Sequence, residues 1–277
     1  MDPVTERVRG HFDELAEAEW QRLAESPRGR IAFEVHRRML AEWIRPGDRV
    51  LEVGAGPGRF TIALAQLGAR VTVTDLSSVQ LALNEQKVRA AGFAAAVESW
   101  TVLDVRDVRT LGESAFDACV AYGGVLSYIF EDASEALGQL VASVRPGGVV
   151  LASVMSTVGS VRYFLPAVAT LLDTFGAEHM NYEIATGDLR RTPGTHTCQM
   201  YRWSEIEALI AAQPCRLVAA SASNCMSLAD AGVVEAFEAD AQRLEWFIDW
   251  EVHLCREPGA LDGGTHTLFA IRRDLAR

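Results

Sequence analysis

The feature that most constrains this chain is an alternation of short apolar runs with helical patterns between residues 49 and 154. Strands that alternate with helices in this way form βαβ units, whose crossovers make the strands parallel. The pattern therefore predicts an α/β fold, with helices covering both faces of a sheet. The predicted strands are 49–55, 70–75, 97–103, 116–122 and 149–154, and the predicted helices between them are 58–68, 77–91 and 132–144.

The segments on either side of this alternation have different patterns. Residues 1–45 are typical of charged helices, and residues 156–200 mix polar and aromatic residues without a clear strand. No linker rich in Pro, Gly or Ser divides the chain, so we predict a single domain over 1–277, with 1–45 as an N-terminal helical cap and 156–200 as a cap insertion. Residues 201–277 hold the last strands and helices, which we predict at 204–213, 216–223, 233–256 and 265–273.

Net charge and cysteine content exclude several kinds of partner and site. The 277 residues carry a net charge of −11, which argues against nucleic acid as the main partner because a phosphate backbone is bound mainly by cations. The five cysteines form no CxxC pair, so they predict no metal site and fit a reducing cytosol. The sequence has no signal-peptide core and no apolar run of about 20 residues. We therefore expect a cytoplasmic protein with neither a nucleic-acid nor a membrane partner.

A glycine-rich loop follows the first predicted strand, in the stretch VLEVGAGPGRF at 50–60. Gly54, Gly56 and Gly58 have no Cβ, so the backbone there can turn sharply and approach a ligand closely. The same glycines can also serve only a tight turn between strand and helix. A dinucleotide site favours a further glycine where this loop has Arg59. The loop therefore favours a nucleoside with a small zwitterionic tail over the nicotinamide dinucleotide of an oxidoreductase.

Two acidic residues end the next two predicted strands. Asp75 lies 21 positions after Gly54, where a carboxylate can accept both hydroxyls of a ribose. It can also be a plain helix N-cap. Asp104 can accept from the exocyclic amine of adenine, and its spacing favours it over Asp107. Together with the glycine loop, these carboxylates predict a site for an adenosine-containing cofactor.

Five successive motifs resemble those of class I S-adenosylmethionine-dependent methyltransferases of the small-molecule type. They are VLEVGAGPG, VTVTDLS, LDVRD, FDACVAYGG and RPGGVVLASV, within about residues 45–155. The resemblance implies a Rossmann-like seven-stranded sheet in the order 3-2-1-4-5-7-6, with strand 7 antiparallel and a helical cap. It also implies that 46–155 is the cofactor-binding half and that the cofactor is S-adenosyl-L-methionine, with S-adenosyl-L-homocysteine as its product.

The resemblance also assigns cofactor-binding residues. The glycine loop would line the methionine part, the ends of the second and third strands would hold the ribose and adenine, and the end of the fourth would lie near the sulfonium. The N-terminal helices would close over the cofactor. The residues are Glu52, Gly54, Ala55, Gly56 and Gly58 for methionine, Asp75 for ribose, Leu76, Asp104 and Val105 for adenine, Ala121, Tyr122 and Gly123 near the sulfonium, and Phe12, Arg22 and His36 from the N-terminal helices.

A methyl acceptor should bind beyond the carboxyl ends of the strands, under the cap. We predict His196 and Tyr128 as catalytic, because an imidazole titrates near neutral pH and Tyr128 follows the fourth strand closely. The alternatives are a surface histidine and an aromatic side chain packed under the cap. Other polar candidates are Tyr163, Asn181, Tyr201, Glu251 and His266.

Motifs typical of DNA, RNA and protein methylation are absent from the sequence. Together with the acidic net charge, this elimination favours a small-molecule acceptor that is methylated on O, N or C. The apolar, aromatic cap suggests a ring-bearing, natural-product-type metabolite, with indole or amino-acid derivatives as options. The alternative is a non-catalytic regulatory or assembly module that binds the cofactor. The sequence leaves open whether the protein forms a homodimer.

Overall fold

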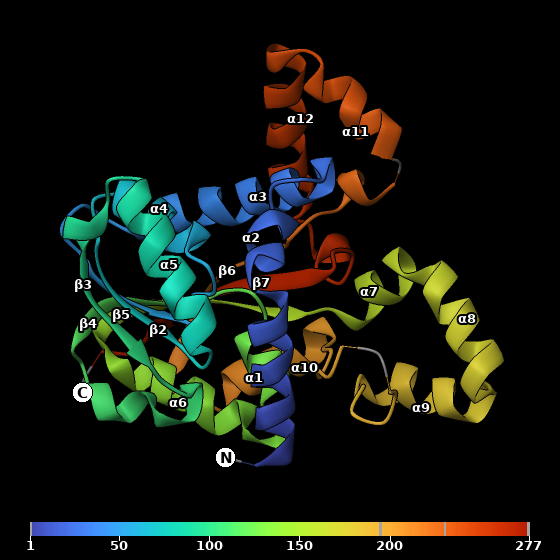
Figure 1. Cartoon of the computed structure of the whole chain (residues 1–277), viewed down its shortest axis with the longest axis horizontal. Coiled ribbons are helices and arrows are strands. Elements are labelled where there is room, and N and C mark those ends of the chain that lie inside the picture. Colours follow the sequence, from blue (N-terminus) through green and yellow to red (C-terminus); the bar gives the residue numbers. More distant parts are fainter. Residues whose placement is uncertain (1, 194–195, 230, 276–277) are drawn as a thin grey trace.

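A seven-stranded sheet in the order β3-β2-β1-β4-β5-β7-β6 forms the centre of the computed structural model (Figure 1). The structure describes residues 2–193, 196–229 and 231–275. Strands β1 to β5 pair in parallel, and β7 runs antiparallel to both of its neighbours. This confirms the predicted order and the antiparallel last strand. The strands are β1 (Arg49–Val53), β2 (Arg70–Asp75), β3 (Val97–Val102), β4 (Phe116–Ala121), β5 (Val144–Met155), β6 (Cys215–Ala222) and β7 (His266–Arg273).

Helices cover both faces of the sheet, as the alternating pattern predicts (Figure 1). One face is packed by α3 (Pro27–Trp43), α4 (Arg59–Gln66) and α5 (Ser78–Ala90), and the other by α6 (Ala133–Ser143) and α10 (Trp203–Ala211). The central strands are apolar on both faces because each face contacts helices. These two apolar layers fix the sheet, and the loops after β1 to β4 emerge together at its carboxyl edge.

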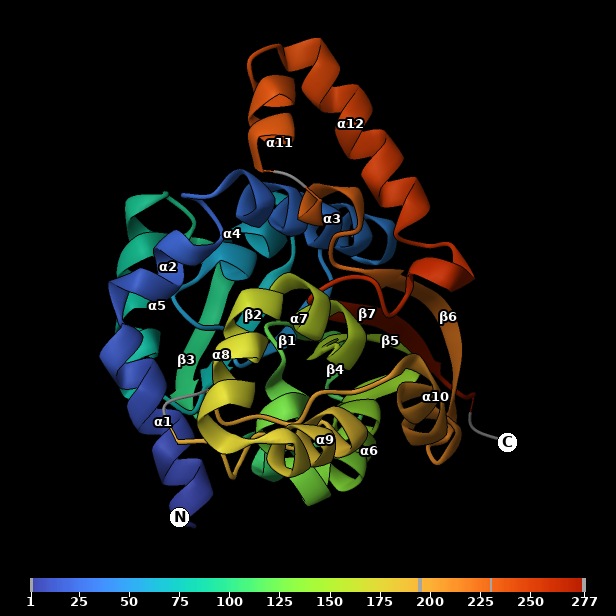
Figure 2. The same cartoon turned by 90° about the vertical axis from the view of Figure 1, so that its right-hand side faces the viewer.

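Two groups of helices lie over that edge. The N-terminal group is α1 (Pro3–Leu15) and α2 (Glu17–Arg22). The segment predicted to lack strands forms α7 (Thr157–Tyr163), α8 (Leu165–Phe175) and α9 (Ala177–Thr186). Figure 2 shows α1, in blue, and α7 to α9, in yellow, on the side where the parallel strands end.

The prediction of one long helix over 233–256 is wrong. The structure has α11 (Ala231–Glu238) and α12 (Ala241–Leu254), which project beyond the sheet (Figure 1). The break occurs because the Asp240 carboxylate accepts from the backbone N–H of Arg243 at 2.9 Å and so caps a new helix. Among the described residues, no helix is long and apolar enough to cross a membrane. Short 3-10 turns are η1 (Ala94–Ala96), η2 (Val105–Leu111), η3 (Val125–Tyr128), η4 (Phe130–Asp132), η5 (Met226–Leu228) and η6 (Pro258–Ala260).

Candidate active site

The glycine loop connects β1 to α4 and needs glycine for two reasons. Gly54, Gly56 and Gly58 have positive φ angles of 63°, 54° and 102°, a region that other residues seldom adopt. A Cβ on Gly54 would lie 2.4 Å from Cγ2 of Val125, whereas a Cβ on Gly56 would meet no atom within 4 Å. The loop is therefore packed on one side and open on the other, at Gly56.

A cavity of about 110 Å³ lies on the open side of this loop. It is bounded by the ends of β1 to β4 and by one face of α1. Eight of the fifteen residues singled out for the cofactor line it, and we refer to it as the cofactor cleft. These eight are Phe12, Gly54, Gly56, Asp75, Leu76, Asp104, Val105 and Gly123.

Asp75 is buried between the glycine loop and the start of α5. Its two carboxylate oxygens accept from the backbone N–H groups of Gly56 and Ser77, each at 2.8 Å. Burial raises the pKa of Asp75 to about 6, although these two hydrogen bonds oppose the shift. The residue therefore fixes the shape of the loop and also presents its carboxyl group to the cleft.

Asp104 has a different electrostatic environment. Burial would raise its pKa, but hydrogen bonds and charge attraction from Arg106 hold the pKa below its usual value. Arg106 binds both carboxylate oxygens, with Nη2 at 2.6 Å and Nε at 3.0 Å. The same guanidinium donates to Asp2 and Thr5 of the N-terminal helix. Asp104 is therefore ionised and joined to the helix that covers the cleft.

Five of the residues singled out for the cofactor lie outside the linings of this cavity and of the one beside it: Glu52, Ala55, Gly58, Ala121 and Tyr122. Glu52 is buried behind the loop, where Thr61 donates to it at 2.6 Å, and burial raises its pKa to about 8. Gly58 faces Asn84 instead of the cleft. Tyr122 packs against His36 and Phe60, and its hydroxyl has no partner among the described residues. These residues lie in the packing around the cleft, and their contact with the cofactor stays a prediction.

A second cavity, of about 490 Å³, adjoins the cofactor cleft. Phe12, Glu19, Gly123 and Tyr128 line both spaces. We refer to this cavity as the acceptor chamber. The remaining two predicted cofactor residues, Arg22 and His36, line the chamber, where Nε and Nη2 of Arg22 bind the Glu19 carboxylate at 2.7–3.0 Å.

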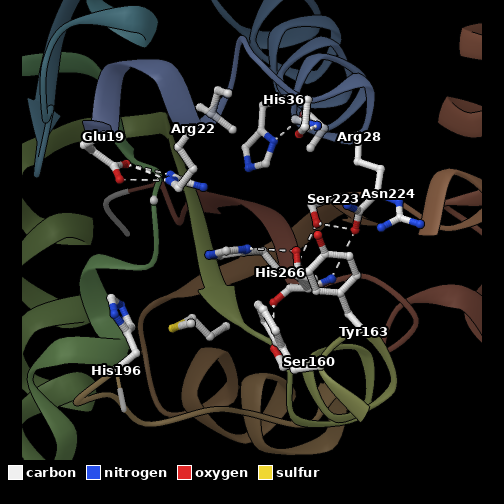
Figure 3. A pocket seen from close by; sticks show the side chains of 18 of the residues that line it. Glu19, Arg22, Arg28, His36, Ser160, Tyr163, His196, Ser223, Asn224 and His266 are labelled. Atoms are coloured by element: carbon white, nitrogen blue, oxygen red, sulfur yellow. Dashed lines mark hydrogen bonds and ion pairs between the residues drawn. The ribbon is translucent and has the colours of Figure 1, made fainter. Parts of the chain in front are cut away.

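Four histidines line the chamber: His11, His36, His196 and His266. Figure 3 shows three of them facing the same space from different elements, His36 from α3, His266 from the start of β7 and His196 from the segment after α9. Burial lowers the pKa of His36 and His196 to about 4 and that of His266 to about 3. These three imidazoles are therefore neutral at pH 7 and can accept a proton.

Tyr128 and His196 form a pair at the junction of the two cavities. The Tyr128 hydroxyl lies 2.6 Å from Nε2 of His196, which is hydrogen-bonding distance. The rings of Tyr128, His196 and Phe12 pack edge-to-face at 5.3–6.2 Å between centroids. Burial raises the pKa of Tyr128 above its usual value. The two residues predicted as catalytic thus meet, although 68 positions separate them.

The other polar candidates have different positions. Tyr163 and His266 line the chamber. Asn181 is exposed on α9, and the Tyr201 hydroxyl donates to the Leu126 carbonyl in the core. Glu251 accepts from the backbone N–H groups of residues 225–227 and so holds a turn.

Sequence reasoning missed part of the polar wall. Arg28, Ser223 and Asn224 line the chamber beside Tyr163 (Figure 3). Arg28 donates from Nε to the Ser227 carbonyl at 3.1 Å. No local motif marks these residues, because the chain brings them together from segments about 200 positions apart.

The comparisons with known proteins agree with this geometry. Residues 50–148 match a family model described as a methyltransferase domain. The chain is 32% identical to a tuberculostearic acid methyltransferase of Mycobacterium tuberculosis over 131 residues, which are 47% of this chain and 29% of that protein. It therefore spans less than a third of the length of that curated relative.

Two solved structures share the fold. A magnesium protoporphyrin IX methyltransferase from Synechocystis with bound S-adenosylhomocysteine has a TM-score of 0.62 at 14% identity, over 98% of this chain and all of that chain. A 1,6-didemethyltoxoflavin-N1-methyltransferase from Burkholderia thailandensis has a TM-score of 0.53 at 17% identity, over 96% and 87%. With the motifs and the strand order, these findings identify residues 50–148 as a methyltransferase domain, and they show that the chain has the fold of class I S-adenosylmethionine-dependent methyltransferases.

Proposed function

We propose that this protein transfers the methyl group of S-adenosyl-L-methionine to a small-molecule acceptor in the chamber. The observation that carries the proposal is the shared boundary of the two cavities. Gly123 and Tyr128 line both the cofactor cleft and the acceptor chamber. A displacement at a methyl carbon requires the two reactants to meet in line, and such a boundary supplies that position.

The residues of the cleft fit this cofactor. A Cβ on Gly56 or Gly123 would meet no protein atom within 4 Å, so the backbone at both positions is open to a ligand. Asp75 offers a carboxylate for the ribose, and Asp104 and Leu76 lie where the adenine would be held. When bound, the cofactor supplies an electrophilic methyl group on a positively charged sulfur.

The protein's own contribution to the reaction is to position the acceptor and to move a proton. We assign this step to Tyr128 and His196, which are hydrogen-bonded at the boundary. As the acceptor loses its O–H or N–H proton to the Tyr128 oxygen, the Tyr128 hydroxyl proton passes to Nε2 of His196. The imidazole can take this proton because burial keeps it neutral at pH 7.

The lining of the chamber supports a ring-bearing acceptor. Phe12, Phe60 and Tyr128 give it aromatic walls, and the histidines give it polar groups that can orient a heteroatom. The Burkholderia 1,6-didemethyltoxoflavin-N1-methyltransferase, which shares the fold, holds the ring-bearing small molecule 1,6-didemethyltoxoflavin. A natural-product-type metabolite methylated on O, N or C is therefore the acceptor class that we propose.

Two measurements test the function separately. Isothermal titration calorimetry with S-adenosylhomocysteine should show binding that Asp75→Asn weakens, whereas NAD should not bind. Incubation with methyl-labelled S-adenosylmethionine and a panel of ring-bearing metabolites should then yield a labelled product. Binding without transfer to any panel member would favour the non-catalytic module instead. Absence of S-adenosylhomocysteine binding would contradict both functions.

A further inference from the structure

An apolar arm opens from the acceptor chamber. The arm is a space of about 240 Å³ that lies among α7, α8 and α9. Met155, Ser160, Phe164 and His196 line both the arm and the chamber. Chamber and arm are therefore neighbouring parts of one space that begins at the cofactor cleft.

The wall of the arm offers almost no polar group to a ligand. Among the described residues that line it, all are apolar except Ser160, Glu183 and His196. The Glu183 carboxylate is already engaged, because Thr192 donates to it and Nε2 of His179 lies 3.4 Å away. A ligand in the arm would therefore contact methyl and methylene groups, as a hydrocarbon chain requires.

Helix α8 shows that the protein does not fill this space itself. Its sequence, LPAVATLLDTF, contains one charged residue, and none of its eleven residues is buried. An apolar helix of a globular protein normally buries one face. Val168 and Leu171 of α8 line the arm and leave it open.

We propose that the acceptor is amphipathic, with its nucleophilic end beside the Tyr128 hydroxyl and a flexible alkyl or acyl chain in the arm. This proposal rests on the proposed function, because it names the substrate class for the same site. Tyr128 borders the cleft and the chamber, and His196 borders the chamber and the arm. A chain attached near the reacting atom can therefore pass His196 directly into the arm.

Chain length should then control affinity. Each methylene that leaves water for an apolar wall should strengthen binding about fourfold, until the arm is full. This contribution is equal in the ground state and the transition state, so in a turnover assay it should lower KM and leave kcat unchanged.

The test uses straight-chain 1-alkanols, from butanol to decanol, as probes of the full-length protein loaded with S-adenosylhomocysteine. Calorimetry should give a dissociation constant that falls about fourfold per added methylene. Ala167→Trp, in the lining of the arm, should weaken octanol binding about tenfold or more. The matched control is Ala169→Trp, an exposed alanine of the same helix outside the lining, which should bind octanol as before.

A dissociation constant that is independent of chain length would overturn the proposal. Equally weakened octanol binding in Ala167→Trp and Ala169→Trp would also overturn it, because the effect would then not depend on the lining of the arm. The apolar face of α8 would then be assigned to a contact between copies of the chain. The failure of the proposed function is a separate result. If S-adenosylhomocysteine does not bind, the methyltransferase function fails, whereas the alkanol series on the cofactor-free protein still tests the arm.

Discussion

Burial shifts pKa values at both cavities, upward for the acid Asp75 in the cleft and downward for the base His196 in the chamber. Asp75 has a pKa raised to about 6, whereas His196 has one lowered to about 4. Each shift disfavours the charged form, as removal from water requires. His196 is therefore neutral above about pH 4, whereas the Asp75 carboxyl group gains its negative charge only as the pH rises through about 6.

Cofactor affinity should therefore depend on pH through Asp75. The ionised carboxylate accepts the ribose hydroxyls, so the dissociation constant of S-adenosylhomocysteine should be constant above about pH 7 and rise about tenfold per unit below about pH 6. Calorimetry over this range measures it, and Asp75→Asn should remove the dependence. Asp104→Asn is the control: because Arg106 keeps the pKa of Asp104 low, this variant should keep the same pH dependence. An unchanged affinity from pH 5 to 8 would contradict the assignment to Asp75.

Catalysis should depend on Tyr128 and His196 as a unit. Tyr128→Phe and His196→Ala should each lower kcat about 100-fold or more, and the double variant should lose little beyond either single one. The rate should be constant near neutral pH and fall as the pH drops through about 4, where His196 becomes charged. His253→Ala, whose side chain is 79% exposed, is the matched control. Additive losses would indicate two separate roles.

The sequence could predict the residues of the cofactor cleft whose place depends on local chain geometry. Gly54 and Gly56 lie in the loop after β1 and Asp75 ends β2, so their places depend on the strand ends alone. Glu52 and Tyr122 lie equally near strand ends but point into the packing, and the face of a buried strand cannot be read where both faces are apolar. Arg28 and Asn224 could not be found, because only the tertiary fold brings them to the chamber.

At the scale of elements, α1 is loosely packed and therefore suited to move over the cleft. Only Thr5 and Val8 of this helix are buried. Hydrogen bonds fasten it instead: Gln80 Nε2 donates to the carbonyls of Phe12 and Ala16 at 2.7 and 3.3 Å. Segments with few buried apolar contacts open locally at low free energy.

Cofactor binding should therefore protect α1 and α2 more than distant elements. In hydrogen exchange, amides of residues 3–22 should slow by up to about 100-fold when S-adenosylhomocysteine is present at about 100 times its dissociation constant. Amides of α11 and α12, which pack on Ile31 away from the cleft, should exchange as before. Equal protection of both regions would show that α1 does not open separately from the rest.

The helix patterns predicted the elements better than their ends. Asp132, where the helix predicted over 132–144 was to begin, makes no side-chain capping bond to α6, and its carboxylate binds Arg106 instead. The helix expected to begin at residue 204 begins at Trp203, and Glu205 accepts from the backbone N–H of Arg202 at 2.7 Å. Capping side chains thus have competing partners that only the tertiary structure supplies.

At the scale of the whole molecule, the sheet joins the cofactor-binding half of the chain to its last strands. Strand β7 pairs with β5 over seven positions, from Val149–Arg272 to Met155–His266. Ile206 and Phe269, which follow the cap insertion in the chain, belong to the same apolar cluster as Leu140 and Val150. The cofactor-binding half therefore shares its core with residues that follow the cap insertion.

This shared core predicts one cooperative unit. Full-length protein should unfold in denaturant with coincident transitions by circular dichroism and tryptophan fluorescence. S-adenosylhomocysteine at about 100 times its dissociation constant should raise the free energy of unfolding by about 2.7 kcal/mol. The fragment 46–155 should show no cooperative transition, because it lacks β6 and β7 and exposes Val150 along an open edge of the sheet. A fragment that unfolds cooperatively and binds the cofactor would instead establish that half as a separate domain, with the cap and the last strands added to it.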